Sequence, residues 1–317
     1  MAKEKRILIA LDGSTQSFGA TMYVARHWAS TEPKVTLMHV MRAVPEVFWD
    51  LQKQAALKQK LKERHHEWVV HTRQTAEEFL AKAKKILTDA NIPEKSVSVN
   101  LQQAQKGVAR DLITESKNGH DAIVLGRRGL SSLQPPFLGS VSTKVIERAH
   151  DVAVWLVGGY SQAPNILLAV DSSEYAASTV HYVGSFAARS DAKITLIHVT
   201  RALEPAFQEL FTMHAQEVDA FMEQLAAETQ AMFKRYRDIL MHHGIQDDRI
   251  TAKNVTQATS RAASILDEAR SAGYGTVVMG RRGLSKVYGF LTGRVTNKVL
   301  HQGEGLAVWI CPANPEE

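Results

Sequence analysis

Nearly all of the 317-residue chain consists of one sequence pattern that occurs twice. The segment ILIALDGS, which contains Asp12, corresponds to ILLAVDSS, which contains Asp171, 159 residues later. Further along, IVLGRRGL around Gly126 corresponds to VVMGRRGL around Gly280, 154 residues later. Self-similarity of this extent indicates one structural unit made twice, so each copy helps to interpret the other.

Within each copy, short runs rich in Val, Ile and Leu alternate with segments of helical period, which is typical of parallel strands joined by crossover helices. We therefore expect two tandem doubly wound α/β domains, residues 1–158 and 164–317, joined by the linker GGYSQAP. Each domain should hold a five-stranded parallel sheet of order 3-2-1-4-5 with helices on both faces. The strands expected in the first copy are residues 6–11, 35–40, 97–101, 121–125 and 152–157.

Helical spacing predicts which side chains face the sheets. The helix after the first strand should bury Phe18, Met22, Ala25 and Ala29 in the first copy, and Ala176, Val180, Val183 and Ala187 in the second. The last helix of each copy should bury Val141, Val145 and Ile146, or Val295, Val299 and Leu300.

A long helical excursion follows each second strand, roughly at residues 41–94 and 200–246. The second one carries a stripe of apolar residues at helical spacing: Phe207, Leu210, Phe211, Val218, Phe221, Met222 and Leu225. Such a stripe is typical of a core or subunit interface, and less often of a cofactor site.

Composition limits the class of protein. Hydrophobic residues make up 44% of the chain, enough for ordinary buried cores, and the single cysteine, Cys311, excludes an internal disulfide framework. The net charge of +5 comes from mixed charges without a long basic run, which disfavours a nucleic-acid partner. The apolar run before Asp12 is too short for a signal peptide or a membrane span. We expect a cytoplasmic protein with no membrane partner.

The candidate binding residues all follow predicted strands. Ligands of open α/β sheets bind beyond the carboxyl ends of the strands, at the point where the strand order reverses. Asp12 and Asp171 end the first strands, and Val40 and Val199 end the second strands. A glycine loop follows each fourth strand and leads into a helix, whose N-terminal N–H groups and partial positive charge favour a phosphate.

The spacing of the glycine loop is the most specific feature of the chain. In the first copy the loop contains Gly126, Gly129 and Gly139 and then Ser140, and the second copy repeats the glycines as Gly280, Gly283 and Gly293. Glycine allows close approach of backbone amides to an anion and tolerates positive φ, and a nearby serine adds a hydroxyl donor. Glycines in ordinary turns are the alternative, but the repeated spacing favours phosphate binding in the first copy.

On these residues the chain resembles the universal stress protein family in its tandem form. The ATP-binding members of that family carry G, two residues, G, nine residues, G and then Ser or Thr, which the first copy matches completely. The resemblance implies ATP as the ligand, together with magnesium. It implies that Asp12 and Val40 meet the adenine and ribose, and that the glycines, Ser140 and Val141 hold the phosphates. The corresponding residues of the second copy are Asp171, Val199, Gly280, Gly283, Gly293 and Arg294.

Two departures from the family pattern affect this expectation. Pro135 and Pro136 stiffen the nine-residue spacer of the first loop. In the second copy Arg294 stands where Ser or Thr is expected, and its guanidinium cannot replace a small hydroxyl in the same space. We therefore expect the first copy to bind nucleotide better and the second phosphate loop to be degenerate.

Other charged and aromatic residues have two interpretations. Arg127, Arg128, Arg281 and Arg282 lie in the glycine loops, where they either contact phosphate or are simply solvated. His39 and His198, near the ends of second strands, are more typical of structural groups than of catalytic ones. Trp155 and Trp309 in the fifth strands are expected in the core, whereas the family resemblance suggests edge strands through which domains pair.

Two histidine groups look like metal sites but lack the spacing. His66 and His71 are five residues apart, so they point about 140° apart on a helix, and a solvated face is the better interpretation. His242 and His243 have no further ligand at a suitable spacing.

No enzyme motif accompanies the glycine loops. The chain contains no G-x-x-x-x-G-K-[ST] loop and no G-x-S-x-G elbow, and no residue is an evident general base for a γ-phosphate. The leading hypothesis is an ATP-binding regulatory protein with an internal domain pair and the option of a further homodimer. A slow ATPase or self-phosphorylating protein and a nucleotide-free dimerisation scaffold are the alternatives.

Overall fold

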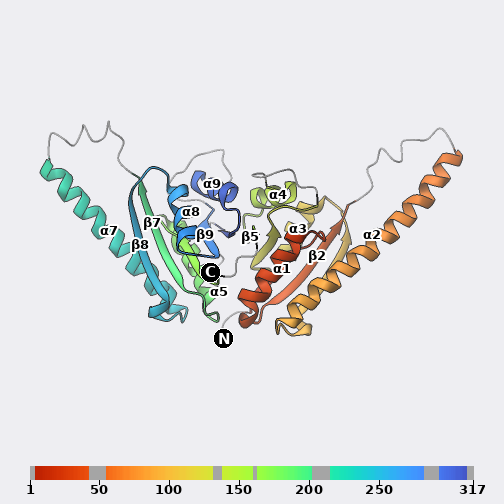
Figure 1. Cartoon of the computed structure of the whole chain (residues 1–317), viewed down its shortest axis with the longest axis horizontal. Helices are drawn as coiled ribbons and strands as arrows, with labels where there is room; N and C mark the ends of the chain where they lie inside the picture. Colours follow the sequence, from red (N-terminus) through yellow and green to blue (C-terminus); the bar gives the residue numbers. More distant parts are fainter. Residues whose placement is uncertain are drawn as a thin grey trace. The chain divides into compact units, whose positions relative to one another are not determined.

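A computed structural model describes residues 4–42, 55–130, 138–159, 163–201, 215–281 and 293–312, with side chains omitted at 55–62, 174 and 215–221 (Figure 1). The chain forms two compact units, Met1–Ala149 and His150–Glu317. Each unit is an α/β fold with a mainly parallel sheet, as the sequence predicts.

The first unit contains a four-stranded parallel sheet of order β3-β2-β1-β4. Its elements are β1 (Arg6–Ala10), α1 (Thr15–Trp28), η1 (Ala29–Thr31), β2 (Lys34–Met41), α2 (Ala55–Asp89), η3 (Glu94–Ser96), β3 (Val97–Gln103), α3 (Val108–Ser116), β4 (Ala122–Gly126) and α4 (Ser140–Arg148). In the central strand, Ile7 lies opposite Val35 of β2 and Ala122 of β4. Ile7, Leu8 and Ile9 are fully buried because helices cover both faces of the sheet.

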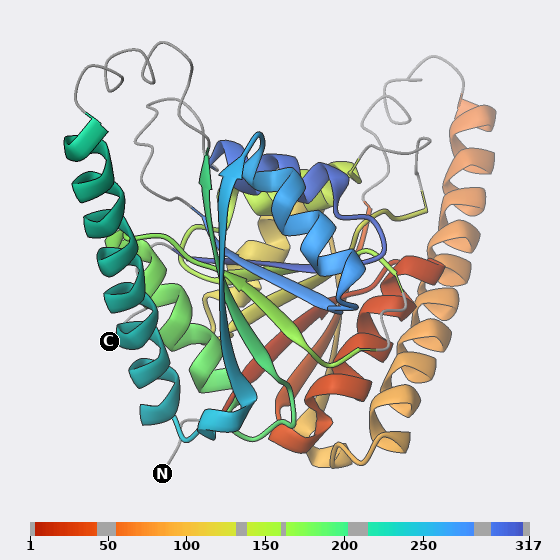
Figure 2. The ribbon, with the colours of Figure 1, turned by 60° about the vertical axis from the view of Figure 1, so that its left-hand side comes forward.

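The second unit contains the parallel order β10-β9-β6-β7-β8, which is the predicted order 3-2-1-4-5 for the second copy, and β5 is paired antiparallel with β10. Its elements are β5 (Ala153–Val157), β6 (Ile166–Ala169), α5 (Glu174–Ala187), β7 (Ile194–Arg201), α7 (Ala215–His242), η4 (Asp247–Arg249), β8 (Ile250–Ala258), α8 (Arg261–Ser271), β9 (Thr276–Gly280), α9 (Arg294–Gln302) and β10 (Ala307–Cys311). Figure 2 shows α5 and α7 together on one side of this sheet and α8 on the other. Each crossover between parallel strands is right-handed, so its helix lies on a face that depends on the direction in which the chain moves across the sheet. The chain moves outward from β6 to β8 and in the opposite direction after β8, so α8 lies on the opposite face from α5 and α7.

The seam between β5 and β10 is built on two tryptophans. Trp155 lies opposite Trp309, and their rings stack with centroids 3.9 Å apart and planes 1° apart. Both side chains are fully buried, and the Trp155 indole N–H donates a 3.0 Å hydrogen bond to the Tyr182 hydroxyl. The core interpretation of the two tryptophans is confirmed, and the two strands that carry them pair with each other, as the family resemblance suggested.

The predicted helix face is right in α5 and right only in part in α1. All four expected α5 positions are buried. Ala25 of α1 is buried as predicted, but Phe18, Met22 and Ala29 are only half-buried. The other buried residues of α1 include Ala20, Val24 and Trp28. The small residues of α1 lie against the sheet, and Phe18 faces a cavity described below. In α4 and α9 the second and third expected positions are buried, whereas Val141 and Val295 line cavities.

The two long helices are anchored along part of their length. In α2, the buried positions Ala76, Leu80, Ala83 and Leu87 all lie in the second half of the helix. Further toward the start of α2, Trp68 is 46% exposed and Val70 51% exposed. In the stripe predicted for the second copy, Met222 is 42% exposed and Leu225 is half-buried, so neither is a core residue of the second unit, and the interpretation as a subunit interface stays a prediction. The side chains of Phe207, Leu210, Phe211, Val218 and Phe221 lie outside the described part of the chain.

Candidate functional site

A cavity of about 830 Å³ lies at the carboxyl ends of β1, β2 and β4 in the first unit. Its volume is within the range of small-molecule sites in proteins. The cavity brings together seven of the predicted binding residues, which are Asp12, Val40, Gly126, Gly129, Gly139, Ser140 and Val141. The rule that ligands of open α/β sheets bind beyond the carboxyl ends of the strands therefore predicted the position of the cavity correctly.

Asp12 ties the first strand to the glycine loop. One carboxylate oxygen, Oδ1, accepts a 2.6 Å hydrogen bond from the Ser14 hydroxyl and a 3.0 Å bond from the Ser14 backbone N–H. The other oxygen, Oδ2, accepts a 3.0 Å bond from the Leu130 backbone N–H. A Cβ atom added at Gly129 would collide with Oδ2, so glycine is required there for Asp12 to reach the loop.

Gly126 and Gly129 serve close packing, and none of Gly126, Gly129 and Gly139 has a positive φ. A Cβ atom at Gly126 would lie 2.8 Å from the carbonyl carbon of Gln16, so this glycine lets β4 approach α1. Gly139 caps α4 with φ −64° and ψ 145°, and its N–H donates to the Arg127 carbonyl at 3.0 Å. The Ser142 hydroxyl donates to the Gly126 carbonyl at 3.0 Å, which joins the two ends of the loop.

The N-terminus of α4 is the feature of the cavity that favours an anion. The helix begins at Ser140, which is exposed, and has no side-chain cap. Ser140 and Val141 line the cavity, so the first N–H groups of the helix open on it. Uncapped N–H groups and the helix dipole favour a negatively charged ligand at this position.

The loop arginines differ from the prediction. Arg127 and Arg281 are each only 2% exposed, so the interpretation as solvated groups is wrong for both, and neither lines the cavity of the first unit or that of the second unit. The half-buried Arg128 lines the first cavity instead. Arg282 and Gly283 lie outside the described residues, as do Pro135 and Pro136.

His39 is a structural group that also faces the cavity. Its Nδ1 atom lies 2.7 Å from the Leu11 carbonyl oxygen, and its ring meets Phe79 edge-on with centroids 5.0 Å apart. Burial lowers the pKa of His39, against the opposing effects of the Leu11 hydrogen bond and the Asp12 charge. His198 of the second unit makes the same contact, with Nδ1 2.9 Å from the Val170 carbonyl oxygen, so the structural interpretation of both histidines is confirmed.

Sequence reasoning missed the contribution of α2 to the cavity. Seven residues of this helix line the cavity: Trp68, His71, Thr72, Thr75, Glu78, Phe79 and Lys82. Their spacing is that of one helix face, which was visible in the sequence but could not be assigned to a ligand site without its partners. His66 and His71 are both exposed, as predicted.

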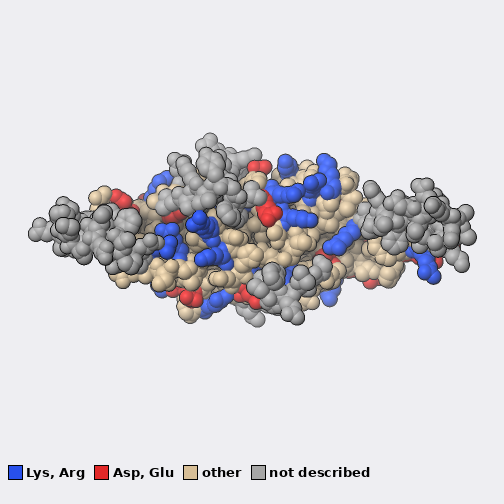
Figure 3. All heavy atoms as spheres, turned by 90° about the horizontal axis from the view of Figure 1, so that it is seen from above, with Lys and Arg blue, Asp and Glu red and all other residues tan. Residues whose placement is uncertain are grey.

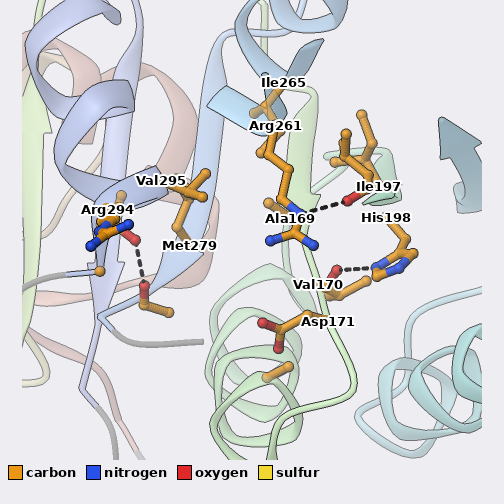
Figure 4. Close-up of a pocket in the computed structure, with 15 residues that line it drawn as sticks. Ala169, Val170, Asp171, Ile197, His198, Arg261, Ile265, Met279, Arg294 and Val295 are labelled. Atoms are coloured by element: carbon orange, nitrogen blue, oxygen red, sulfur yellow. Dashed lines mark hydrogen bonds between the residues drawn. The ribbon is translucent and has the colours of Figure 1, made fainter. Parts of the chain in front are cut away.

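The second unit has a much smaller cavity, of about 120 Å³, at the equivalent position. The predicted residues Asp171, Val199, Gly280, Gly293 and Arg294 line it (Figure 4). Arg261 also lines it and donates a hydrogen bond from Nε to the Val199 carbonyl oxygen at 3.1 Å. Arg261 opens α8 as Val108 opens α3, so a long cation stands in the second cavity where the first has an apolar side chain.

Tyr236 of α7 fixes the loop that follows β6. Its hydroxyl donates a 2.7 Å hydrogen bond to the Asp171 carbonyl oxygen, and burial, with a smaller effect of the Asp171 charge, raises the pKa of Tyr236 to about 12. The Asp171 carboxylate accepts a 3.0 Å bond from the Ser173 backbone N–H, as Asp12 does from Ser14.

Histidines of the second unit form a pair that the sequence did not reveal. His181 of α5 and His243 lie with Nδ1 and Nε2 3.2 Å apart. Burial lowers the pKa of His181, with a further effect from His242 and Arg235. Among the described residues, no group of three or more His, Cys, Asp or Glu side chains is arranged to hold a metal ion.

The surface charge and the helix composition bear on the expected partners of the protein. On the face in Figure 3, Lys and Arg side chains are more frequent than Asp and Glu, and the two signs are interspersed. Within the described part of the chain, every helix is too short or too polar to cross a membrane.

The fold and the first cavity define a tandem α/β protein with a glycine loop at the carboxyl edge of its sheet. The family model of the universal stress protein family matches residues 4–157 and 163–305, so the chain belongs to that family. A universal stress protein of Mycolicibacterium smegmatis is 25% identical over 309 residues, and one of Mycobacterium tuberculosis is 24% identical over 305 residues, each match covering 94% of both chains. The crystal structure of a universal stress protein from Archaeoglobus fulgidus has the same fold, with a TM-score of 0.60, 18% identity and 98% of each chain covered.

Proposed function

We propose that the first unit binds ATP with magnesium and that the protein acts as a nucleotide-binding regulator in the stress response. The observation that carries the proposal is the uncapped N-terminus of α4, which opens on a cavity of nucleotide size beside Asp12 and Val40. The phosphates lie at Gly139, Ser140 and Val141, where helix N–H groups can donate to them.

The apolar part of the same cavity suits the base. Leu11, Val40, Val108 and Leu112 line it, so an adenine ring is covered by aliphatic side chains. Arg128 lines the loop side and adds a positive charge near the phosphates.

The donor set fits a magnesium ion that arrives with the nucleotide. Both carboxylate oxygens of Asp12 already accept hydrogen bonds from Ser14 or Leu130, so Asp12 is not a free metal ligand. Mg²⁺ commonly keeps several waters and binds through substrate phosphates, and the exposed Ser140 hydroxyl is the side chain placed to add a ligand. The metal would neutralise phosphate charge.

We assign one nucleotide to each chain. The second cavity has about one seventh of the volume of the first, and Arg261 and Arg294 both line it. Arg294 is the first residue of α9, where the first unit has the small side chain of Ser140.

The nucleotide bound by the purified protein tests the function. Freshly purified protein is denatured and removed, and the supernatant is chromatographed for adenine nucleotides. ATP at about one per chain supports the regulator. ADP or AMP with measurable turnover supports a slow ATPase or a self-phosphorylating protein. The absence of any nucleotide, together with no thermal shift on adding Mg-ATP, supports a scaffold and refutes the proposal.

A pair of substitutions at the helix caps tests the site. Gly139 and Gly293 have nearly the same cap geometry, with φ −64° and −60°. Aspartate is a favoured N-cap residue, so Gly139→Asp preserves α4 while its carboxylate occupies the phosphate position. Calorimetric titration with Mg-ATP should show one site in the wild type, none in Gly139→Asp, and one in the matched control Gly293→Asp. Unchanged binding in Gly139→Asp would exclude this phosphate site.

A further inference from the structure

The first cavity extends well beyond the glycine loop, along one face of α2. We call this part the α2 lobe and define it by Phe18, Trp68, His71, Thr72, Phe79 and Lys82, all of which line the cavity. From Trp68 to Lys82 the helix advances about 21 Å at 1.5 Å per residue. The lobe is therefore elongated, and it is continuous with the phosphate end because a single cavity includes both.

The α2 lobe is aromatic with a positive charge at one point. Phe18 and Phe79 are half-buried, and Trp68 remains 46% exposed although indole is the largest apolar side chain in the lobe. The Lys82 ammonium lies 4.8 Å from the centre of the Phe18 ring, in the range of a cation–π contact. Such a surface gains free energy when a planar or chain-like apolar group covers it.

Among the described side chains, the cavity of the second unit has no counterpart of this lobe. The second unit has an equivalent long helix, α7, yet no described α7 side chain lines its cavity. Helices α2 and α7 can be aligned by their buried residues, with Leu80 opposite Phe233 and Leu87 opposite Leu240. On that alignment Tyr236 takes the place of Ala83 and bonds to the Asp171 carbonyl.

We infer that the α2 lobe binds an apolar acyl or aryl group carried by the nucleotide, so that the preferred ligand is an adenine nucleotide with an apolar substituent. This inference rests on the proposed nucleotide site. The base lies against Leu11, Val40 and Leu112, which leaves the aromatic side chains of α2 for the substituent.

ATP and its 2′/3′-O-(N-methylanthraniloyl) ester provide the test, since they differ only by an apolar aromatic group. Both are titrated against the full chain in the presence of magnesium. We expect the wild type to bind the ester about three- to tenfold more tightly than ATP, as for one added aromatic contact. Trp68→Ala should remove that preference and leave the affinity for ATP unchanged.

Val70→Ala is the matched control, because Val70 lies on the same helix, is 51% exposed and does not line the cavity. It should bind both ligands as the wild type does. Equal affinity of the wild type for the two ligands would overturn the inference while the ATP site stands. An equal loss of both ligands in Trp68→Ala would also overturn it, because the lobe would then hold the base. No binding of ATP at all would refute the proposed function and the inference with it.

Discussion

Gly126→Ala should destabilise the first unit although it adds only a methyl group. The added Cβ would lie 2.8 Å from the carbonyl carbon of Gln16, 2.9 Å from its oxygen and 3.0 Å from its Cβ. Two of these atoms belong to the backbone of α1, so the helix itself must shift. Overpacking of this kind costs about 1–3 kcal/mol, and the lower entropy of the unfolded alanine chain offsets about 0.4–1 kcal/mol. We expect a net loss of about 1–2 kcal/mol.

The matched control is Gly139→Ala, in the same loop. Its Cβ would lie 3.4 Å from the Arg128 Cα, which is an ordinary contact, and its φ of −64° suits alanine. A net loss of about 1–2 kcal/mol lowers the melting temperature of a domain of this size by about 2–8 °C. Because a two-unit chain need not unfold in one step, thermal melts should be paired with hydrogen exchange of Ala122–Gly126. Equal stability of the two variants would show that Gly126 is not a packing glycine.

Two further predictions concern the second cavity and pH. The double variant Arg261→Val/Arg294→Ser should raise the stoichiometry of Mg-ATP from one to two per chain in calorimetry, because it places the first unit's side chains at the two positions where arginine lines the second cavity. An unchanged value of one would refute the role of the arginines. Burial lowers the pKa of His39 below its ordinary value of about 6.5, so the unfolded chain takes up a proton first and stability is lost as the pH falls from about 6.5 through the folded-state pKa. His39→Gln should reduce this pH dependence of the free energy of unfolding, measured by urea unfolding. Part of the pH dependence should remain, because burial also lowers the pKa of His120. An unchanged pH dependence would contradict the assignment of the effect to His39.

The strands and the carboxyl-edge residues could be predicted because they depend on local period and topology. Runs of Val, Ile and Leu between helical segments define a parallel sheet, and its crossovers bring Asp12, Val40 and the glycine loop to one edge. The domain limits, the cytoplasmic location and the pairing of chains remain predictions, and the linker residues 160–162 lie outside the described part of the chain.

The missed features all depend on tertiary neighbours. Arg127 and Arg128 are adjacent and identical in type, yet one is buried and the other lines the cavity, and nothing in the sequence distinguishes them. The face of α1 was predicted only in part, because Phe18 is apolar like a core residue but lines the cavity of the first unit. The packing role of Gly126 could not be predicted, because its contact with Gln16 joins residues 110 apart in the sequence.

At three positions near its cavity or the loop after β6, the second unit carries a larger side chain than the first. Relative to the first unit, the second replaces Val108 with Arg261, Ser140 with Arg294 and Ala83 with Tyr236, and each change adds a larger side chain. Arg261 and Tyr236 also hydrogen-bond to the carbonyls of Val199 and Asp171, and each such bond contributes about 0.5–1.5 kcal/mol without any ligand.

The first unit keeps its cavity open, so under the proposed function its stability depends on nucleotide. A ligand present at 100 times its dissociation constant adds about 2.7 kcal/mol to the free energy of unfolding of the unit that binds it. The second unit gains nothing from nucleotide if Arg261 and Arg294 occupy its cavity. Changes in nucleotide concentration would therefore change the free energy of unfolding of the first unit and leave that of the second unit unchanged. A regulatory protein needs such a ligand-dependent free-energy difference between its states.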